Sequence, residues 1–465
     1  MLTRIEIDGF KTFEDMCLDV PPFLVVLGPN ASGKSNLFDA IRFLSQLASE
    51  DLRTACRGLR GEPHELFRRD ATGEPGTRIR LAVEVLLEPR VRDSWGQEVE
   101  LVHTRLRYEI TIERRTDNRG IERLVVTEET ARALGRGDDR WLSETGRTGI
   151  IPETSGAFRE AAMKHAKHRR PTPFLETVQE GGKATFHIHQ DTRQGRVRPA
   201  DAAEATVLSS TRTAELPHLY ALREELRSWR FLQLDPASLR RASPTIAPEL
   251  LEPDGSNLAT VLARIQAETA TESRPKGALV DIAAALGALI PGVTDVSVIE
   301  DTRNREYRVD IAMRDGRPFS SRVVSDGTLR VLALLAMLHD PKHHGLVCFE
   351  EPENGVHPMR LRTLIHRLRD LVTDPAREES AGDPLSQILM NSHSPVVLSA
   401  LKEDNKLPFD VVFADIVDVV DPGKPGIGRR TRMRTVRSDL LVSAAEEHVV
   451  PAEVSRYLST VDANA

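Results

Sequence analysis

A glycine-rich loop near the start of the chain has the residue types and spacing needed to bind phosphate. It is Gly28-Pro29-Asn30-Ala31-Ser32-Gly33-Lys34-Ser35, followed by Asn36, and it matches the Walker A pattern. The apolar run Phe23–Leu27 precedes it and a stretch with helical spacing, 36–47, follows it. In that context the backbone N–H groups and the helix N-terminus can face an anion, Lys34 can neutralise β- and γ-phosphates, and Ser35 can ligate Mg²⁺. A glycine-rich turn without a ligand is the alternative, which the strand–loop–helix context disfavours.

Two neighbouring carboxylates follow a second apolar run. Leu346–Phe349 ends directly in Glu350 and Glu351, as expected for a buried parallel strand that delivers acids to its carboxyl end. Glu350 could orient Mg²⁺ through a water molecule, while Glu351 could polarise the water that attacks a γ-phosphate. The alternative is a charged pair on a solvated turn. The apolar run before the pair and the sequence 352–355 after it favour the catalytic interpretation.

A histidine follows a third apolar run. Ile388–Met390 ends in Asn391-Ser392-His393-Ser394-Pro395, which places one imidazole at a strand end, about 40 residues after Glu351. His393 could reach the γ-phosphate there. A surface or capping histidine is the ordinary alternative.

The elements that must position these residues indicate an α/β fold. Alternation over 78–87, 101–111 and 121–127 predicts an antiparallel β-lobe beside a phosphate-binding core. Residues 130–200 appear irregular apart from a strand-like stretch, 184–189, and we expect an insertion or lid there. We expect helices at 216–234, 257–266, 279–289, 327–338 and after Pro358, with strands at 293–300, 307–313, 346–349, 387–390 and 410–413, and a short helix near 452–458.

These elements suggest three segments. They are 1–128, the first part of the phosphate-binding core with the β-lobe; 129–270, an insertion or lid and helical subdomain; and 271–465, the second part of that core. No sustained heptad pattern occurs between the phosphate loop and residue 325, so a long coiled coil is not expected.

Taken together, the motifs resemble the SMC/RecF-like ABC-class ATPases, and most closely the compact bacterial RecF-like and OLD-like members. The resemblance covers both ends of the chain. Five motifs carry it in order: Ile7-Asp8-Gly9-Phe10-Lys11-Thr12-Phe13, the Walker A loop with the residues after it, Ser325-Asp326-Gly327-Thr328, Phe349-Glu350-Glu351-Pro352-Glu353, and Asn391-Ser392-His393-Ser394.

The resemblance implies a dimer that closes on two ATP molecules. Ser325 and Gly327 would form the signature that binds the γ-phosphate held by the other subunit's Walker A loop. The same Ser-Asp-Gly-Thr is also well suited to an ordinary helix N-cap, and the two interpretations are compatible. Lys11 of the opening motif and Gln190, or else Gln194, are further candidates for nucleotide contacts.

Two departures from the family pattern stand out. Glu350 occupies the position where the family usually has Asp, so the contact with Mg²⁺ could run through a different water geometry. The signature is Ser-Asp-Gly-Thr rather than Leu-Ser-Gly-Gly-Gln.

Composition limits the partners. The 63 basic and 70 acidic residues give a net charge of -7, which argues against a generally basic nucleic-acid binder. Local clusters at 164–170 and at Arg429, Arg430, Arg432, Arg434 and Arg437 could follow a DNA backbone, or could be solvated faces. No stretch is apolar enough to span a bilayer and the start does not resemble a signal peptide, so we expect a cytoplasmic protein without a membrane partner. The three cysteines have no metal-ligand spacing.

The leading hypothesis is therefore an ATP-driven switch in DNA repair or antiphage defence, acting as a homodimer or higher homo-oligomer. The residues after His393 are too few for a TOPRIM nuclease domain, so a separate effector protein such as a nuclease would do the damage. The alternative is the ATPase subunit of an ABC transporter, although the signature, the length and the opening motif disagree with it. A catalytically inactive scaffold is disfavoured because every residue that hydrolysis requires is present.

Overall fold

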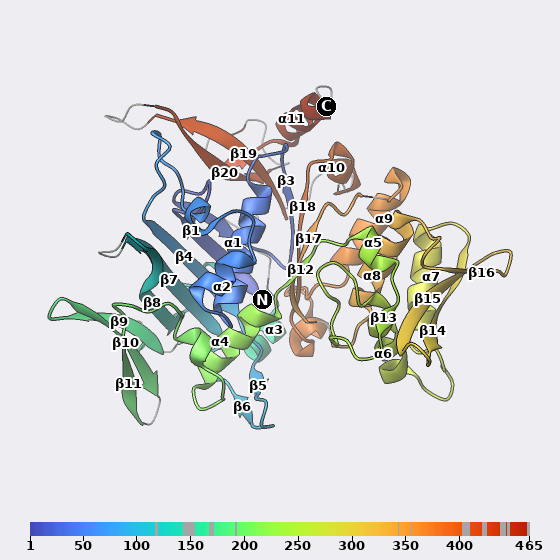
Figure 1. The fold of residues 1–465 in the computed structure, drawn as a ribbon, viewed down its shortest axis with the longest axis horizontal. Coiled ribbons are helices and arrows are strands. Elements are labelled where there is room, and N and C mark those ends of the chain that lie inside the picture. The colour runs from blue at the N-terminus through green and yellow to red at the C-terminus, as the bar shows by residue number, and fades with distance from the viewer. Residues whose placement is uncertain are drawn as a thin grey trace.

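A computed structural model describes residues 1–116, 120–142, 154–166, 172–190, 193–342, 344–354, 356–401, 410–420, 426–437, 443 and 447–462. Two sheets and a helical lobe dominate it (Figure 1). None of the helices in these ranges has the length and apolar character needed to cross a membrane.

The central sheet has seven strands, five of them parallel neighbours. Because parallel neighbours are buried on both faces, their sequences are short continuous apolar runs, which is the pattern that made them recognisable. In spatial order the strands are β12 (Arg230–Leu232), β17 (Gly345–Glu350), β18 (Ser386–Ser392), β3 (Phe23–Leu27), β19 (Val411–Val419), β20 (Gly428–Val436) and β21 (His448–Val449).

The second sheet is antiparallel and has eight strands, which extends the predicted β-lobe. In order they are β11 (Arg193–Pro199), β10 (Lys183–Gln190), β9 (Leu175–Glu180), β8 (Glu122–Ala133), β7 (Arg105–Thr116), β4 (Arg78–Leu86), β1 (Leu2–Asp8) and β2 (Met16–Asp19). The expectation of irregular structure over 130–200 was therefore wrong for 175–199, where three strands form a meander at the sheet edge. Only 184–189 showed a strand-like pattern, because the flanking strands are polar and Gly-containing.

The central sheet separates two hydrophobic cores. Along β3, Leu24 and Val26 pack into one core, while Phe23, Val25 and Leu27 pack into the other. The first core contains the helix α1 (Lys34–Leu47), the helix α4 (Pro217–Ser228) and the antiparallel sheet. The second contains the helical lobe, so the two halves of the molecule lie on opposite sides of β12, β17, β18 and β3 (Figure 1).

The helical lobe surrounds α8 (Asp326–Leu338). It comprises α5 (Pro236–Leu239), α6 (Leu258–Thr269), α7 (Leu279–Leu289), α9 (Pro358–Arg369) and a sheet made of β13 (Ser243–Pro244), β14 (Val293–Asp301), β15 (Glu306–Met313) and β16 (Pro318–Ser320). The helix expected over 216–234 ends at Ser228, because Arg230–Leu232 pairs with buried β17 instead. The structure shows no long coiled coil in the ranges it describes.

Smaller elements complete the chain. They are α2 (Leu52–Arg57), α3 (Gly156–Ala162), α10 (Pro395–Leu401), α11 (Pro451–Asp462), β5 (Arg90–Arg92) and β6 (Glu98–Glu100). The central sheet takes strands from all three predicted segments, 1–128, 129–270 and 271–465, and the boundaries between these segments stay a prediction.

Candidate functional site

The glycine-rich loop connects β3 to α1 at the carboxyl edge of the central sheet. Ala31 and Gly33 both have positive φ, 62° and 92°, which turns successive peptides of the loop. A Cβ atom on Gly33 would lie 2.0 Å from the hydroxyl oxygen of Thr431, and one on Gly28 would lie 2.3 Å from the carbonyl oxygen of Ala414. Gly33 is thus required by its backbone conformation and by close packing, and Gly28 is required by close packing.

Lys34 is buried inside this loop. Its Nζ donates hydrogen bonds of 2.7 Å to the carbonyl oxygens of Gly28 and Pro29. Burial lowers the pKa of Lys34 to about 8, opposed by the negative charges of Glu351, Glu353 and Glu350. The loop therefore encloses a cation that donates to neutral carbonyls, and phosphate oxygens would be stronger partners for it.

The two predicted carboxylates lie at the same sheet edge. Glu350 ends β17 and is paired in register with Asn391 of β18, and Ser392 is paired with Leu27 of β3 just before the phosphate loop. Burial raises the pKa of Glu350, while Arg60 and Arg42 lower it. The sheet register thus brings three segments that are distant in sequence to one place.

Glu351 is held in an unusual backbone conformation, with a φ of 53°. Its N–H donates to the carbonyl oxygen of Asn391 (3.1 Å), and its Oε2 accepts a 2.6 Å hydrogen bond from Asn354. The imidazole Nδ1 of His393 lies 3.2 Å from its Oε1. The structure therefore brings together Lys34, Glu351 and His393, the three residues predicted to be catalytic.

Glu353 is a neighbour to which the sequence assigned no role. Its Oε1 accepts a 2.5 Å hydrogen bond from Ser392, its Oε2 is buried without a hydrogen-bond partner, and burial raises its pKa. Glu353 belongs to the Pro-Glu-Asn sequence that follows the acidic pair, and that sequence was the only signal for it.

Lys11 lies beside the first turns of α1 rather than in the loop itself. Its Nζ donates to Asp39 (2.6 Å) and to the carbonyl oxygen of Arg60 (3.0 Å). Arg60 donates in turn to Asp39 (3.0 Å) and to the carbonyl oxygen of Ser35 (2.8 Å). Sequence reasoning missed Arg60, which stands in a Gly-Leu-Arg-Gly stretch without any recognised spacing.

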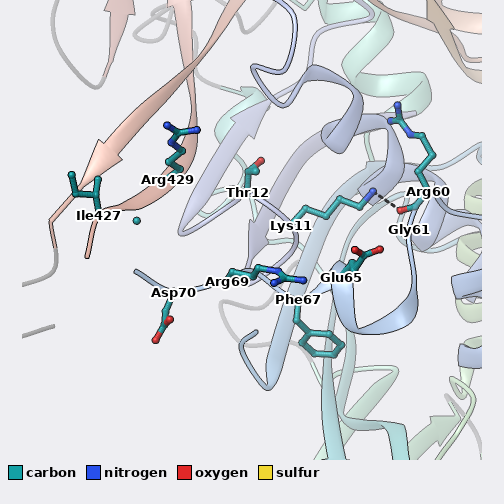
Figure 2. Close-up of a pocket in the computed structure, with 11 residues that line it drawn as sticks. Lys11, Thr12, Arg60, Gly61, Glu65, Phe67, Arg69, Asp70, Ile427 and Arg429 are labelled. Atoms are coloured by element: carbon teal, nitrogen blue, oxygen red, sulfur yellow. Dashed lines mark hydrogen bonds between the residues drawn. The ribbon is translucent and has the colours of Figure 1, made fainter. Parts of the chain in front are cut away.

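A pocket of about 530 Å³ opens next to this cluster (Figure 2). It lies beside the first turn of α1, because two of its lining residues contact that turn. Thr12 accepts a hydrogen bond from Asn36, and Arg60 donates to the carbonyl oxygen of Ser35. The lining comprises Lys11, Thr12, Arg60, Gly61, Glu65, Phe67, Arg69, Asp70, Ile427, Gly428 and Arg429. The pocket offers basic side chains and backbone groups beside the phosphate loop.

Ser325 and Gly327 lie apart from the loop within one chain. Ser325 is the N-cap of α8, and its hydroxyl accepts a hydrogen bond from the N–H of Thr328 (3.3 Å). Asp326 forms an ion pair with Arg240. α8 and α1 lie on opposite sides of the central sheet (Figure 1), and a contact of Ser325 or Gly327 with a phosphate loop stays a prediction.

The structure does not place Gln190 near the phosphate loop. Its backbone ends β10, which lies next to one edge of the antiparallel sheet. The opposite edge is β2, and five strands lie between the two: β9, β8, β7, β4 and β1. Gln194 lies on β11, at the outer edge of the same sheet. Both stay predictions that no contact in the described ranges supports.

The basic clusters are largely engaged in ion pairs. On β20, Arg429 pairs with Asp418, and Arg432 and Arg434 pair with Asp415. In the other cluster Lys164 pairs with Glu100, and residues 167–170 lie outside the described ranges. A DNA-contacting role for either cluster stays a prediction.

The donors predicted for Mg²⁺ suit that ion. Ser35 stands in the first turn of α1 and Glu350 at the end of β17, and both supply the hard oxygen ligands that Mg²⁺ prefers. Within the described ranges no group of three or more His, Cys, Asp or Glu residues could hold a metal by itself.

Comparison with known proteins gives the family. The family described as "AAA domain, putative AbiEii toxin, Type IV TA system" matches residues 23–399. The chain is also 46% identical over 54 residues to the chromosome partition protein Smc of Methanocaldococcus jannaschii, covering 11% of this chain and 5% of that protein. It is 26% identical over 209 residues to Smc of Thauera aminoaromatica, covering 43% of this chain and 15% of that protein. The chain thus spans a small part of the length of these relatives.

Among solved structures, the Smc head bound to the C-terminal winged-helix domain of ScpA is 12% identical, with a TM-score of 0.47, over 93% of this chain and 97% of that chain. The Smc head domain of Pyrococcus furiosus, with an extended coiled coil, is 11% identical, with a TM-score of 0.42, over 93% of this chain and 96% of that chain. With a match over most of its length, the chain belongs to the AAA family of the putative AbiEii toxin type, and it is an ATPase of the SMC/RecF-like ABC class.

Proposed function

We propose that the protein binds ATP with Mg²⁺, hydrolyses it, and alternates between an ATP-bound dimer and separate subunits. The observation that carries this proposal is the meeting of Lys34, Glu351 and His393 at the carboxyl edge of the central sheet. An anion-binding loop, a carboxylate and an imidazole at one edge are the groups that phosphoryl transfer to water requires.

Each residue has a role that its position supports. The N–H groups of Asn30 to Asn36 and the Nζ of Lys34 would hold the phosphates, and Lys34 would exchange the carbonyls of Gly28 and Pro29 for phosphate oxygens. Ser35 and Glu350 would hold Mg²⁺, which neutralises phosphate charge when bound. Glu351 would orient and polarise the attacking water, and His393 would contact the γ-phosphate.

The pocket beside the loop suits the nucleoside. Arg60 reaches from its wall to the carbonyl oxygen of Ser35, and Arg69 and Arg429 add positive charge to its lining (Figure 2). Its volume of about 530 Å³ lies within the usual range of roughly 300–1,000 Å³ for small-molecule sites. Lys11, at the same wall, would contribute positive charge near the phosphates.

Dimerisation would complete the site. Ser325 and Gly327 start α8 on the side of the sheet away from α1, so a second copy must present them to the γ-phosphate. Val323, two residues before Ser325, is 71% exposed, and Met359 at the start of α9 is 79% exposed. Apolar side chains exposed near a polar signature are typical of a surface that is covered in a complex.

For the biological context we propose DNA repair or antiphage defence. The family description names a putative toxin of a type IV toxin–antitoxin system, and it does not decide between the two. A separate effector, such as a nuclease, would then act when ATP closes or releases the dimer. The family match does not favour the transporter alternative.

The test compares wild type with Glu351→Gln, with Glu379→Gln as a control at an exposed carboxylate. Phosphate release and light scattering are followed with ATP and Mg²⁺, with and without duplex DNA. We expect wild type and the control to hydrolyse ATP and the Glu351→Gln protein to accumulate as an ATP-bound dimer. Retention of ATP by wild type without phosphate release would contradict the hydrolytic role, and dimers that form equally without ATP would contradict the switch.

DNA binding is tested with the same proteins. A shift of labelled duplex by the ATP-bound Glu351→Gln dimer at low salt would support a DNA-linked role. The absence of any shift would leave the ATP switch in place and exclude DNA as its direct partner.

A further inference from the structure

A chain of hydrogen bonds joins the phosphate loop to a strand near the other end of the sequence. Asn36 Nδ2 donates to the hydroxyl of Thr12 (2.9 Å), and the hydroxyls of Thr12 and Thr431 are 2.6 Å apart. The hydroxyl of Thr431 donates to the carbonyl oxygen of Ser32 (3.2 Å). Thr431 is only 2% exposed, and its N–H also donates to the carbonyl oxygen of Thr12 (2.8 Å).

The direction of this chain is fixed by chemistry. An amide NH₂ can only donate and a carbonyl oxygen can only accept, while each hydroxyl has a single proton. The proton of Thr431 goes to Ser32, so the short contact between the hydroxyls must use the proton of Thr12. The hydrogen bonds therefore all donate in the same direction: Asn36 donates to Thr12, Thr12 to Thr431, and Thr431 to the carbonyl oxygen of Ser32 in the phosphate loop.

The last bond of the chain orients a peptide that matters for anion binding. The Ser32–Gly33 peptide is trans, as no cis peptide occurs in the described ranges, so the carbonyl of Ser32 and the N–H of Gly33 point in opposite directions. Thr431 holds the carbonyl on its own side. The N–H of Gly33 is thereby turned to the opposite side, away from β20, and backbone N–H groups are what a phosphate-binding loop presents to its ligand.

Packing reinforces this orientation. Gly33 has a φ of 92°, and Thr431 fills the space that a Cβ atom would occupy there. β20 starts at Gly428, and Gly428 and Arg429 line the pocket beside the loop. One strand therefore touches both the phosphate loop and the wall of the neighbouring pocket.

We propose that Thr431 is a positioning residue of the phosphate loop, which sets nucleotide affinity by orienting the Ser32–Gly33 peptide and links that affinity to β20. This inference rests on the proposed binding of ATP, and it adds a residue and a strand that neither the motifs nor the family match assign.

The test uses Thr431→Val, which keeps the branched shape and removes the hydroxyl, and Thr431→Ser, which keeps the hydroxyl. Thr435→Val on the same strand is the matched control, because it removes only a hydrogen bond to the carbonyl oxygen of Glu447. Affinity of the full chain for a non-hydrolysable ATP analogue with Mg²⁺ is measured by calorimetry. KM, kcat and the melting temperature without nucleotide are measured on the same samples.

We expect Thr431→Val to weaken analogue binding about tenfold, which corresponds to about 1.4 kcal/mol, and to raise KM by a similar factor. The kcat at saturating ATP should stay within about twofold, because the residue touches neither Glu351 nor His393. Thr431→Ser should bind within about threefold of wild type, and Thr435→Val should change the melting temperature alone.

Thr12→Val interrupts the same series of hydrogen bonds one step earlier. It replaces Thr431→Val in the test if that variant folds poorly. Its loss of affinity should not add to that of Thr431→Val in the double variant. Unchanged affinity in both single valine variants would overturn the inference, as would equal losses in Thr431→Val and Thr431→Ser. Failure of wild type to bind the analogue would overturn the proposed function itself, which is a distinct result.

Discussion

Lys34 is a cation whose burial opposes the stability of the fold. Burial lowers its pKa from 10.5 to about 8, so between these values the unfolded chain binds more protons than the folded one. The stability that this residue contributes therefore rises as pH increases from about 8 to about 10.5. Its two bonds to loop carbonyls offset only part of the desolvation.

Replacing this cation by an apolar side chain should stabilise the protein and abolish its binding of ATP. We expect Lys34→Met to raise the free energy of unfolding by about 1–3 kcal/mol at pH 7, with the gain shrinking toward pH 10. Urea unfolding of both proteins at the two pH values measures this. A gain that is the same at both pH values would show that the charge of Lys34 is not its source. ATP binding should be lost in the variant at every pH.

Gly33 is the residue at which conformation and packing coincide. Gly33→Ala should destabilise the protein by roughly 1–3 kcal/mol and abolish ATP binding, because φ is 92° and Thr431 occupies the Cβ position. Gly73→Ala is the matched control, since Gly73 has a φ of 87° and nothing lies within 4 Å of a Cβ atom there. Melting temperatures and calorimetry compare the two. Equal losses of stability would mean that the contact with Thr431 adds nothing to the cost of placing alanine at a positive φ.

At the scale of elements, Ser325 is the N-cap of α8 and also belongs to the proposed signature that contacts the γ-phosphate. Substitutions can separate these two roles. Ser325→Ala removes the N-cap bond to Thr328 and should cost about 1 kcal/mol of stability. Ser325→Asp restores a capping side chain, so its stability should be near wild type, yet its charge would face a γ-phosphate. We expect both variants to lose ATP-dependent dimers in light scattering. Normal dimers with Ser325→Asp would show that the residue is only a cap.

The sequence was informative for elements whose pattern is local. The ends of β3, β17 and β18 were predictable because each is a short apolar run followed by polar residues, and parallel strands place their carboxyl ends together. β9 and β11 were not, because these polar strands are stabilised mainly by pairing with β10 rather than by an apolar periodicity of their own. The end of α4 was missed for a similar reason, since pairing with β17 overrides the helical pattern of 230–232.

Residues that complete the site from afar had no local signal at all. Thr431 lies 399 positions from Ser32, and Arg60 lies 25 positions from Ser35, so neither belongs to a motif that contains its partner. The sequence therefore predicted the polar residues that directly follow the strands. Thr431 and Arg60, which contact the phosphate loop and α1 from elsewhere, became visible only in the three-dimensional structure.

For the whole molecule, a buried ion pair joins the antiparallel sheet to the segment after β8. Arg105 and Asp139 are fully buried, with bonds of 2.7 and 2.8 Å between them, and His165 lies 2.8 Å from Asp139. Burial by itself would raise the pKa of Asp139, but the guanidinium of Arg105 and the hydrogen bond with His165 hold it well below its usual range. Its contribution to stability is thus present near neutral pH and is lost as pH falls through the lowered pKa.

Asp139→Asn should cost about 3–5 kcal/mol, because it leaves Arg105 buried without its counter-charge. The double variant Arg105→Met, Asp139→Leu should recover a large part of that loss. Urea unfolding at pH 7 measures both. A double variant that is no more stable than Asp139→Asn would mean that the pair is needed for packing rather than for charge balance.

The position of β3 also constrains how the chain is made. Its two neighbours, β18 and β19, come more than 350 residues later, as does Thr431, which is 399 residues from Ser32. At typical ribosomal rates this delay is about 20–80 s. Until then the loop at Gly28 has a helix behind it but neither strand beside it. A nascent chain should therefore bind ATP only after β18 and β19 have been made, which would keep incomplete copies from entering the proposed dimer.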